Sequence, residues 1–250
     1  PASPPTVLPM LVALHGFTEI DLSWREVFAD SPTTVTAPLL PGHGWAPCSD
    51  NTTIANVAAD IAPRLGKKGS DLLGYSMGGR IALQLALDYP QLVHRLVLIS
   101  CRPGIADPAA RQARLERDER LAEILEDDGI GPFVAWWERQ PVLRTVTAPA
   151  PLAEQILRGR RLNQNPLGLA AALRRLGQGS MEPAWDRLAE LKMPVLLLAG
   201  AGDPAYVNDM QRMAEHIPHA EIDIIPAAGH ALHREHPKDL VARIDAFLAS

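Results

Sequence analysis

Residues 71 to 80 read Asp-Leu-Leu-Gly-Tyr-Ser-Met-Gly-Gly-Arg. Ser76 stands in a Gly74-x-Ser76-x-Gly78 frame, directly after an apolar run and directly before the helical pattern of residues 81 to 87. A sharp turn from a strand into a helix pushes a serine hydroxyl into the open, and glycines at the flanking positions let the backbones pack closely. The stretch therefore predicts a nucleophile elbow and makes Ser76 the first candidate for a reactive residue.

Apolar runs and helical patterns alternate through much of the chain. Strands are expected near residues 10 to 14, 35 to 40, 71 to 74, 94 to 100, 194 to 199 and 220 to 225. Helical patterns, such as residues 56 to 65 and residues 238 to 248, separate or follow these runs. The alternation predicts an α/β fold with a mostly parallel, doubly wound sheet.

The strand signals stop between Ser100 and about Asp186. Helical segments, broken repeatedly by proline and glycine, take over in this part of the chain. We expect residues 101–185 to form an inserted helical cap that roofs the carboxyl ends of the strands. Residues 1–100 and 186–250 would then form the catalytic core.

Two further candidates follow Ser76 in the chain order serine, acid, histidine. Asp203 comes after the buried run of residues 194 to 199, on a loop that reads Gly-Ala-Gly-Asp. His230 comes after the short strand of residues 220 to 225 and directly follows a glycine. Each lies at the exit of a later strand, so we expect His230 to act as the base for Ser76 and Asp203 to orient it.

His233 lies three residues beyond His230 and is a rival for the role of base. We favour His230, because its place at the strand exit lets its side chain turn back toward Ser76. His233 is better suited to a pocket wall or the surface. Two histidines at this spacing could also suggest a metal pair, but no third ligand cluster accompanies them and the two cysteines are scattered. We expect no metal and no cofactor.

A reaction through an oxyanion or an enolate also needs hydrogen-bond donors aimed at the developing charge. The residue after the nucleophile, Met77, offers one backbone N–H. Phe17 offers another, since it follows a buried strand that ends in His15-Gly16. We therefore predict an oxyanion hole made by the N–H groups of Phe17 and Met77.

Composition and charge limit the possible functions. The chain has 250 residues, is 47% apolar and carries a formal net charge of −5, which argues against nucleic-acid binding. It shows neither an apolar stretch long enough to span a membrane nor the pattern of a secretory leader, so a cytoplasmic enzyme is expected. The predicted cap holds 12 of the 20 arginines, none of the four lysines and 11 of the 29 acids.

Most of these arginines suit solvated helix faces, but a minority could line the cleft and bind carboxylates with their planar forks. Arg80 is the clearest case. It lies four residues after Ser76, one helical turn into the elbow helix, so it can reach the same pocket edge.

The chain resembles the MenH family, the 2-succinyl-6-hydroxy-2,4-cyclohexadiene-1-carboxylate (SHCHC) synthases of menaquinone biosynthesis, which have the α/β-hydrolase fold. The resemblance runs from about residue 10 to the end of the chain. It rests on four motifs: residues 14–17 (Leu-His-Gly-Phe), 74–80 (Gly-Tyr-Ser-Met-Gly-Gly-Arg), 136–142 (Trp-Trp-Glu-Arg-Gln-Pro-Val) and 229–237 (Gly-His-Ala-Leu-His-Arg-Glu-His-Pro). One departure is Leu40, where many relatives carry an acidic residue before Pro-Gly-His-Gly.

This resemblance implies a lyase that eliminates pyruvate from 2-succinyl-5-enolpyruvyl-6-hydroxy-3-cyclohexene-1-carboxylate. That small molecule carries three carboxylates. By matching motif positions, Arg80 and Arg161 would clamp carboxylates, with Tyr75 and Trp137 as further contacts. Trp137 suits the core of the cap equally well.

Two other functions stay open at this point. A hydrolase of the same fold, either a carboxylesterase or a carbon–carbon bond hydrolase, would use the same three residues with water as its second substrate. A binding module without activity is a third class, but damage to Ser76, Asp203 or His230 would be expected there, and all three are intact.

Overall fold

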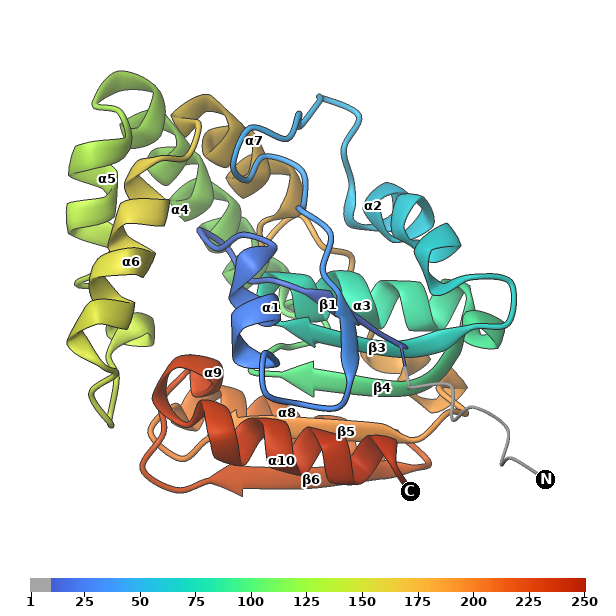
Figure 1. Cartoon of the computed structure of the whole chain (residues 1–250). Coiled ribbons are helices and arrows are strands. Elements are labelled where there is room, and N and C mark those ends of the chain that lie inside the picture. Colours follow the sequence, from blue (N-terminus) through green and yellow to red (C-terminus); the bar gives the residue numbers. More distant parts are fainter. Residues whose placement is uncertain (1–9) are drawn as a thin grey trace.

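A sheet of six parallel strands lies at the centre of the molecule, a computed structural model that describes residues 10 to 250 (Figure 1). The strand order is β2-β1-β3-β4-β5-β6. The strands are β1 (Met10–Leu14), β2 (Thr34–Thr36), β3 (Ser70–Tyr75), β4 (Val93–Ile99), β5 (Val195–Gly200) and β6 (Ala220–Ile225). All neighbouring pairs are parallel, as the sequence predicts. The first nine residues of the predicted core lie outside the described range.

The predicted strand of residues 35 to 40 is too long, since β2 ends at Thr36. Pro38 and Pro41 have no backbone N–H, so this segment cannot continue a regular ladder. Leu40 instead donates its N–H to Nε2 of His15 at 3.1 Å. The segment leaves the sheet because its backbone bonds a side chain at the end of β1.

Helices cover both faces of the sheet, and alternate residues of the strands supply the two cores. On one face, α2 (Ile54–Ile61), α3 (Met77–Asp88) and α8 (Pro204–His216) pack on side chains such as Leu72 and Leu98. On the other, α1 (Leu22–Val27) and α10 (Pro237–Leu248) pack on side chains such as Leu73 and Val97. Burial on both faces explains why the central strands are almost entirely apolar.

Short helical segments connect the longer elements of the core and the cap. The predicted helix of residues 56 to 65 divides at Ile61, after which Pro63 lies in a separate turn. The remaining short elements are η1 (Ala62–Leu65), η2 (Pro90–Leu92), η3 (Pro141–Leu143), η4 (Trp185–Glu190) and α9 (Leu232–Glu235).

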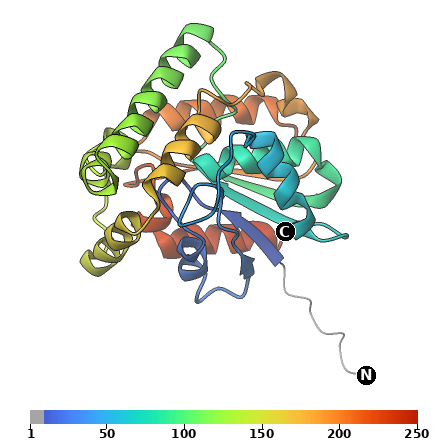
Figure 2. The ribbon, with the colours of Figure 1, turned by 90° about the horizontal axis from the view of Figure 1, so that it is seen from above.

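Four helices lie between β4 and β5 and gather at one end of the sheet: α4 (Pro108–Asp127), α5 (Ile130–Trp137), α6 (Pro151–Leu162) and α7 (Pro166–Leu176) (Figure 1). Seen from above, α4, α5 and α6 lie to one side of the strands (Figure 2). α4, α5 and α7 share a small core of their own, which includes Leu125, Phe133 and Leu173. Met181 and Ala184, in contrast, pack into the main core. The cap limits of residues 101–185 therefore stay a proposal.

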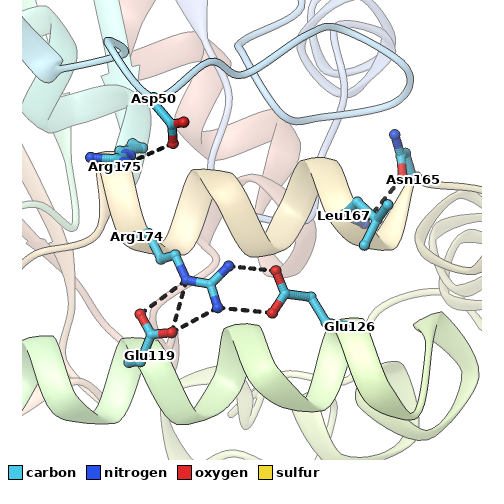
Figure 3. A network of polar contacts seen from close by, with 7 residues as sticks. All are labelled: Asp50, Glu119, Glu126, Asn165, Leu167, Arg174 and Arg175. Carbon is cyan, nitrogen blue, oxygen red and sulfur yellow. Dashed lines mark hydrogen bonds and ion pairs between the residues drawn. The ribbon is translucent and has the colours of Figure 1, made fainter.

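Ion pairs join α7 to its neighbours (Figure 3). Arg174 on α7 donates to Glu119 and Glu126 on α4, with Nε 2.9 Å from both carboxylate oxygens of Glu119. Arg175 pairs with Asp50 at 2.7 Å. The side chain of Asn165 accepts the N–H of Leu167 at 3.1 Å and begins α7. Because the ion pairs are exposed, each contributes little to the stability of the fold.

Among residues 10 to 250, no helix is long and apolar enough to cross a membrane.

Candidate active site

Ser76 lies between β3 and α3 with a backbone that few side chains adopt. Its φ of 51° and ψ of −107° are strained for a residue other than glycine. A Cβ atom at Gly74 would lie 2.4 Å from the carbonyl oxygen of Gly78, and one at Gly78 would lie 2.4 Å from that of Leu14. Only glycine fits at either position, so this turn has the tight geometry predicted for a nucleophile elbow.

Three polar side chains meet at the carboxyl ends of β3, β5 and β6. Nε2 of His230 lies 3.0 Å from Oγ of Ser76, and Nδ1 of His230 lies 2.7 Å from Oδ2 of Asp203. With a proton on Nδ1 donated to Asp203, Nε2 is left to accept the proton of the serine hydroxyl. Each contact is within hydrogen-bond range, so the geometry suits proton transfer from Ser76 to His230.

The loop after β1 carries Phe17, which is one of the two predicted oxyanion donors. His15 fixes the start of this loop, since its Nδ1–H donates to the carbonyl of Gly16 at 2.9 Å while its Nε2 accepts the N–H of Leu40. The other predicted donor, Met77, is the first residue of α3. Within the described chain, neither the Phe17 nor the Met77 N–H donates to a backbone oxygen. Both groups are therefore free to bind a developing negative charge, and their role stays a prediction.

His43 lies buried behind the Phe17 loop. Its ring meets those of Phe17 and His15 edge to face, at centroid distances of 5.5 and 4.9 Å. Nδ1 lies 3.1 Å from the carbonyl oxygen of Pro41. Burial, helped by the neighbouring His15, lowers the pKa of His43 to about 3. His15 shifts in the same direction, again because of burial. Both rings are neutral at physiological pH.

We expect the free energy of unfolding to rise with pH between about 3 and 6.5, where an unfolded His43 binds a proton that the folded one refuses. One such proton gives a slope of about 1.4 kcal/mol per pH unit. Urea unfolding over this pH range measures the slope. His43→Asn, which keeps a donor for the carbonyl of Pro41, should reduce this slope by the contribution of about one proton. An unchanged slope in that variant would show that other groups cause the acid sensitivity.

A cavity of about 690 Å³ opens above Ser76 and His230. Its wall includes Arg80, which is 5% exposed and donates from Nη1 to the carbonyl of Gly177 at 2.8 Å. Nε of Arg80 is buried and, within the described chain, has no hydrogen-bond partner. Burial, together with the charge of Arg114, lowers the pKa of Arg80 to about 10, so it stays charged at neutral pH.

Three more arginines line this cavity: Arg102, Arg114 and Arg117. Their spacing in the sequence does not by itself place them there. Arg114 contacts Asp118 and Gln178, while Arg102 pairs with Asp209 and lies 4.7 Å from the ring centroid of Tyr206. Against these four guanidinium groups the wall, as far as the structure describes it, has two carboxylates, those of Asp118 and Asp203, and Asp209, which is not part of the wall, pairs with Arg102. Positive charge is still in excess. The cavity therefore favours an anion.

Tyr75 and Trp137 both line the cavity. Tyr75 is 4% exposed, and its ring lies 5.4 Å from that of His230. Trp137 donates from Nε1 to Oγ1 of Thr18 at 3.1 Å, so it also ties the cap to the loop of Phe17. Either aromatic ring can contact a molecule bound beside Ser76.

Arg161 is the one predicted contact that does not line the cavity of Ser76. Its Nε donates to Oγ1 of Thr18 at 3.3 Å, and its Nη1 lies 3.3 Å from Glu138. It faces a second cavity instead, together with Arg144, Arg158 and Arg234. The sequence pattern could not reveal that Thr18 and Glu138 already accept hydrogen bonds from this guanidinium group.

His233 has a different partner from His230. Its Nε2 lies 2.9 Å from Oε1 of Glu19, and both side chains are buried. Burial alone would raise the pKa of Glu19, but the charge of His233 and their hydrogen bond outweigh it and lower that pKa to about 2. His233 thus holds the segment after Phe17, and His230 is the histidine that reaches Ser76.

Sequence comparison gives consistent relatives. The model of the alpha/beta hydrolase family matches residues 11–244. A Bacillus subtilis (strain 168) protein, provisionally named as a 2-succinyl-6-hydroxy-2,4-cyclohexadiene-1-carboxylate synthase, is 36% identical over 98% of this chain and 92% of its own. The synthase of that name from Klebsiella pneumoniae (strain 342) is 31% identical over 97% of this chain and 94% of its own.

Solved structures agree with these relatives. MenH from S. aureus is 34% identical, with a TM-score of 0.91 over 96% of this chain and 93% of its own. A thermophilic esterase from Thermogutta terrifontis, solved with malate bound, is 28% identical, with a TM-score of 0.79 over 98% of this chain and 90% of its own. The higher TM-score shows that the backbone of this chain matches MenH more closely than it matches this esterase.

Proposed function

This chain belongs to the alpha/beta hydrolase family and, within it, to the SHCHC synthases, and on this premise we propose that its substrate is the tricarboxylate 2-succinyl-5-enolpyruvyl-6-hydroxy-3-cyclohexene-1-carboxylate. Elimination of pyruvate from this molecule gives SHCHC, a step of menaquinone biosynthesis. The chain is thus a lyase built on a hydrolase scaffold.

The observation that carries the proposal is the set of four arginines in the cavity of Ser76. A guanidinium group binds a carboxylate through two parallel hydrogen bonds, which a neutral ester would not need. We assign Arg80, with its unpaired Nε, as the principal carboxylate contact. Tyr75 and Trp137 are assigned as further substrate contacts.

The proposed reaction begins with removal of the ring proton alpha to the succinyl ketone. Oγ of Ser76 takes this proton as its own proton passes to Nε2 of His230, and Asp203 stabilises the imidazolium that forms. The ketone becomes an enolate, whose oxygen would accept the N–H groups of Phe17 and Met77. When the enolate collapses, its electrons form a ring double bond at the carbon that lost the proton, the existing ring double bond shifts by one position, and the carbon–oxygen bond to the enolpyruvyl group breaks. The enolate of pyruvate leaves and takes up a proton from the imidazolium of His230, which restores the neutral histidine, so no acyl-enzyme is needed.

We place this reaction in the cytoplasm and propose no cofactor. Cys48 and Cys101 are both free thiols, which suits a reducing compartment. Burial raises the pKa of Cys101 to about 12, so this thiol stays protonated and does not compete with Ser76 as a nucleophile.

Pyruvate release tests the proposal directly. The upstream synthase generates the unstable substrate in situ, and pyruvate and diene absorbance are followed with and without this protein. We expect release well above the spontaneous rate, with feeble cleavage of p-nitrophenyl acetate and butyrate assayed in parallel. Brisk ester cleavage without added pyruvate release would make the protein a hydrolase, as its resemblance to the Thermogutta esterase allows.

A further inference from the structure

Glu235 is a buried carboxylate that the proposed reaction does not use. It lies at the end of α9 and is 7% exposed. Its Oε1 accepts the N–H of Gly229 at 2.8 Å. Its Oε2 accepts two more, from Val146 at 2.6 Å and from Thr147 at 2.9 Å. One carboxylate therefore satisfies three backbone donors from two distant segments.

The two segments belong to different parts of the proposed machinery. Gly229 directly precedes His230. Val146 and Thr147 lie in the cap, shortly after Leu143, which lines the cavity of Ser76. Thr147 adds a bond of its own, from Oγ1 to the carbonyl of Ala227 at 2.7 Å. The cap segment of residues 144 to 147 is thus joined to the His230 loop at two points.

Close packing confirms how tightly these loops fit. A Cβ atom at Gly229 would lie 2.7 Å from the carbonyl oxygen of Arg144. One at Gly202, the residue before Asp203, would lie 2.4 Å from the side chain of Val146. The cap segment therefore rests against the loops of both partners of Ser76, and a shift of this segment cannot leave those loops unmoved.

We propose that Glu235 is a positioning residue that locks the His230 loop to the cap, so that the alignment of His230 with Ser76 depends on the docking of residues 144 to 147. A buried ionised carboxylate can accept all three bonds, each strengthened by its charge. A glutamine cannot, because its amide group would turn N–H bonds toward at least one backbone donor. The inference rests on the proposed function, since it gives Glu235 a role in the same reaction.

The test compares Glu235→Gln with the wild-type protein in two independent readouts. In pyruvate release, we expect kcat to fall on the order of tenfold with KM nearly unchanged, because small misalignment of a catalytic group is costly while Arg80 is untouched. In proton NMR, we expect the resonance of the Nδ1–H that His230 donates to Asp203 to broaden or disappear. A purely structural role would lower the melting temperature without changing kcat or the His230 resonance at about room temperature.

Two further variants sharpen the result. In Glu154→Gln, a cap residue loses its ion pair with Arg234, and no bond to the His230 loop changes. This variant should therefore keep the kcat and the NMR signal of the wild type. Thr147→Ala weakens the same junction from the cap side and should change both readouts in the direction of Glu235→Gln, by less. If Glu235→Gln does not fold, the two readouts of Thr147→Ala decide whether Glu235 positions His230.

The outcomes separate the two proposals. If wild-type protein releases no pyruvate, the proposed function fails, while the NMR comparison still decides the role of Glu235. If wild-type protein is active and Glu235→Gln keeps both its kcat and its His230 signal, the positioning role is overturned and the lyase stands.

Discussion

Replacing either Ser76 or His230 by alanine is expected to lower kcat for pyruvate release by roughly 10²- to 10⁴-fold, the usual contribution of a positioned acid–base group. Without Ser76, His230 has no oxygen at 3.0 Å through which to take the substrate proton. Without His230, the serine proton has no acceptor, and a neutral hydroxyl group that keeps its proton is a very weak base. Steady-state kinetics with substrate made in situ measures both losses.

The double variant distinguishes a joint role from two separate ones. Residues that act as a unit are not additive, so Ser76→Ala with His230→Ala should be barely slower than either single change. His233→Gln is a useful comparison, because this residue bonds Glu19 rather than Ser76. It should retain far more activity than His230→Ala. Independent losses that multiply in the double variant would contradict the relay from Ser76 to His230.

The sequence predicts the elbow well because close backbone approach there leaves room only for glycine. Gly74 is required by backbone atoms within the turn and Gly78 by the end of the neighbouring strand β1, so the requirement appears as fixed spacing around Ser76. The same is true of the parallel sheet, since burial on both faces makes each central strand apolar. Asp203 and His230 follow from their places at strand exits. Their distances to each other and to Ser76 come only from the structure.

The cavity wall is less predictable, because the arginines of α4 at positions 111, 114, 117 and 120 lie on more than one face of the helix. Arg114, Arg117 and Leu121 are spaced by three, four and seven residues and line the cavity together, whereas Arg120 lies off this stripe. That spacing is a signal the sequence does contain. Its use requires knowing which face of α4 meets the core, and this depends on how α7 docks against it. Arg161 is a different case: its guanidinium group bonds Thr18 and Glu138, and its role as a carboxylate contact stays a prediction.

Glu235 could not be assigned from sequence for a related reason. Its three donors come from Gly229, six residues before it, and from a cap segment about 90 residues before it. No periodicity links positions so far apart. A buried carboxylate whose bonds are all to backbone N–H groups becomes visible only when the loops are placed together.

Arg80→Lys is expected to lower kcat/KM for pyruvate release by roughly 10- to 100-fold, since a hydrogen bond to a charged group contributes about 1.5–3 kcal/mol. In the structure, Nη1 of Arg80 donates to the carbonyl of Gly177, which leaves Nε and Nη2 as a side-on fork for a carboxylate. Lysine has one nitrogen in place of three. It can replace the bond to Gly177 or contact the substrate, but it cannot do both with the same geometry.

The form of the loss reports what Arg80 does. If the guanidinium group holds a carboxylate equally in substrate and transition state, KM should rise while kcat stays near the wild-type value. Arg174→Lys is the matched control, because Arg174 makes ion pairs on the outside of the cap and should leave kcat and KM unchanged (Figure 3). Wild-type kinetics in Arg80→Lys would remove Arg80 from the binding site. The anionic preference of the cavity would then rest on Arg102, Arg114 and Arg117, whose positive charge alone does not distinguish a tricarboxylate from a simpler acid.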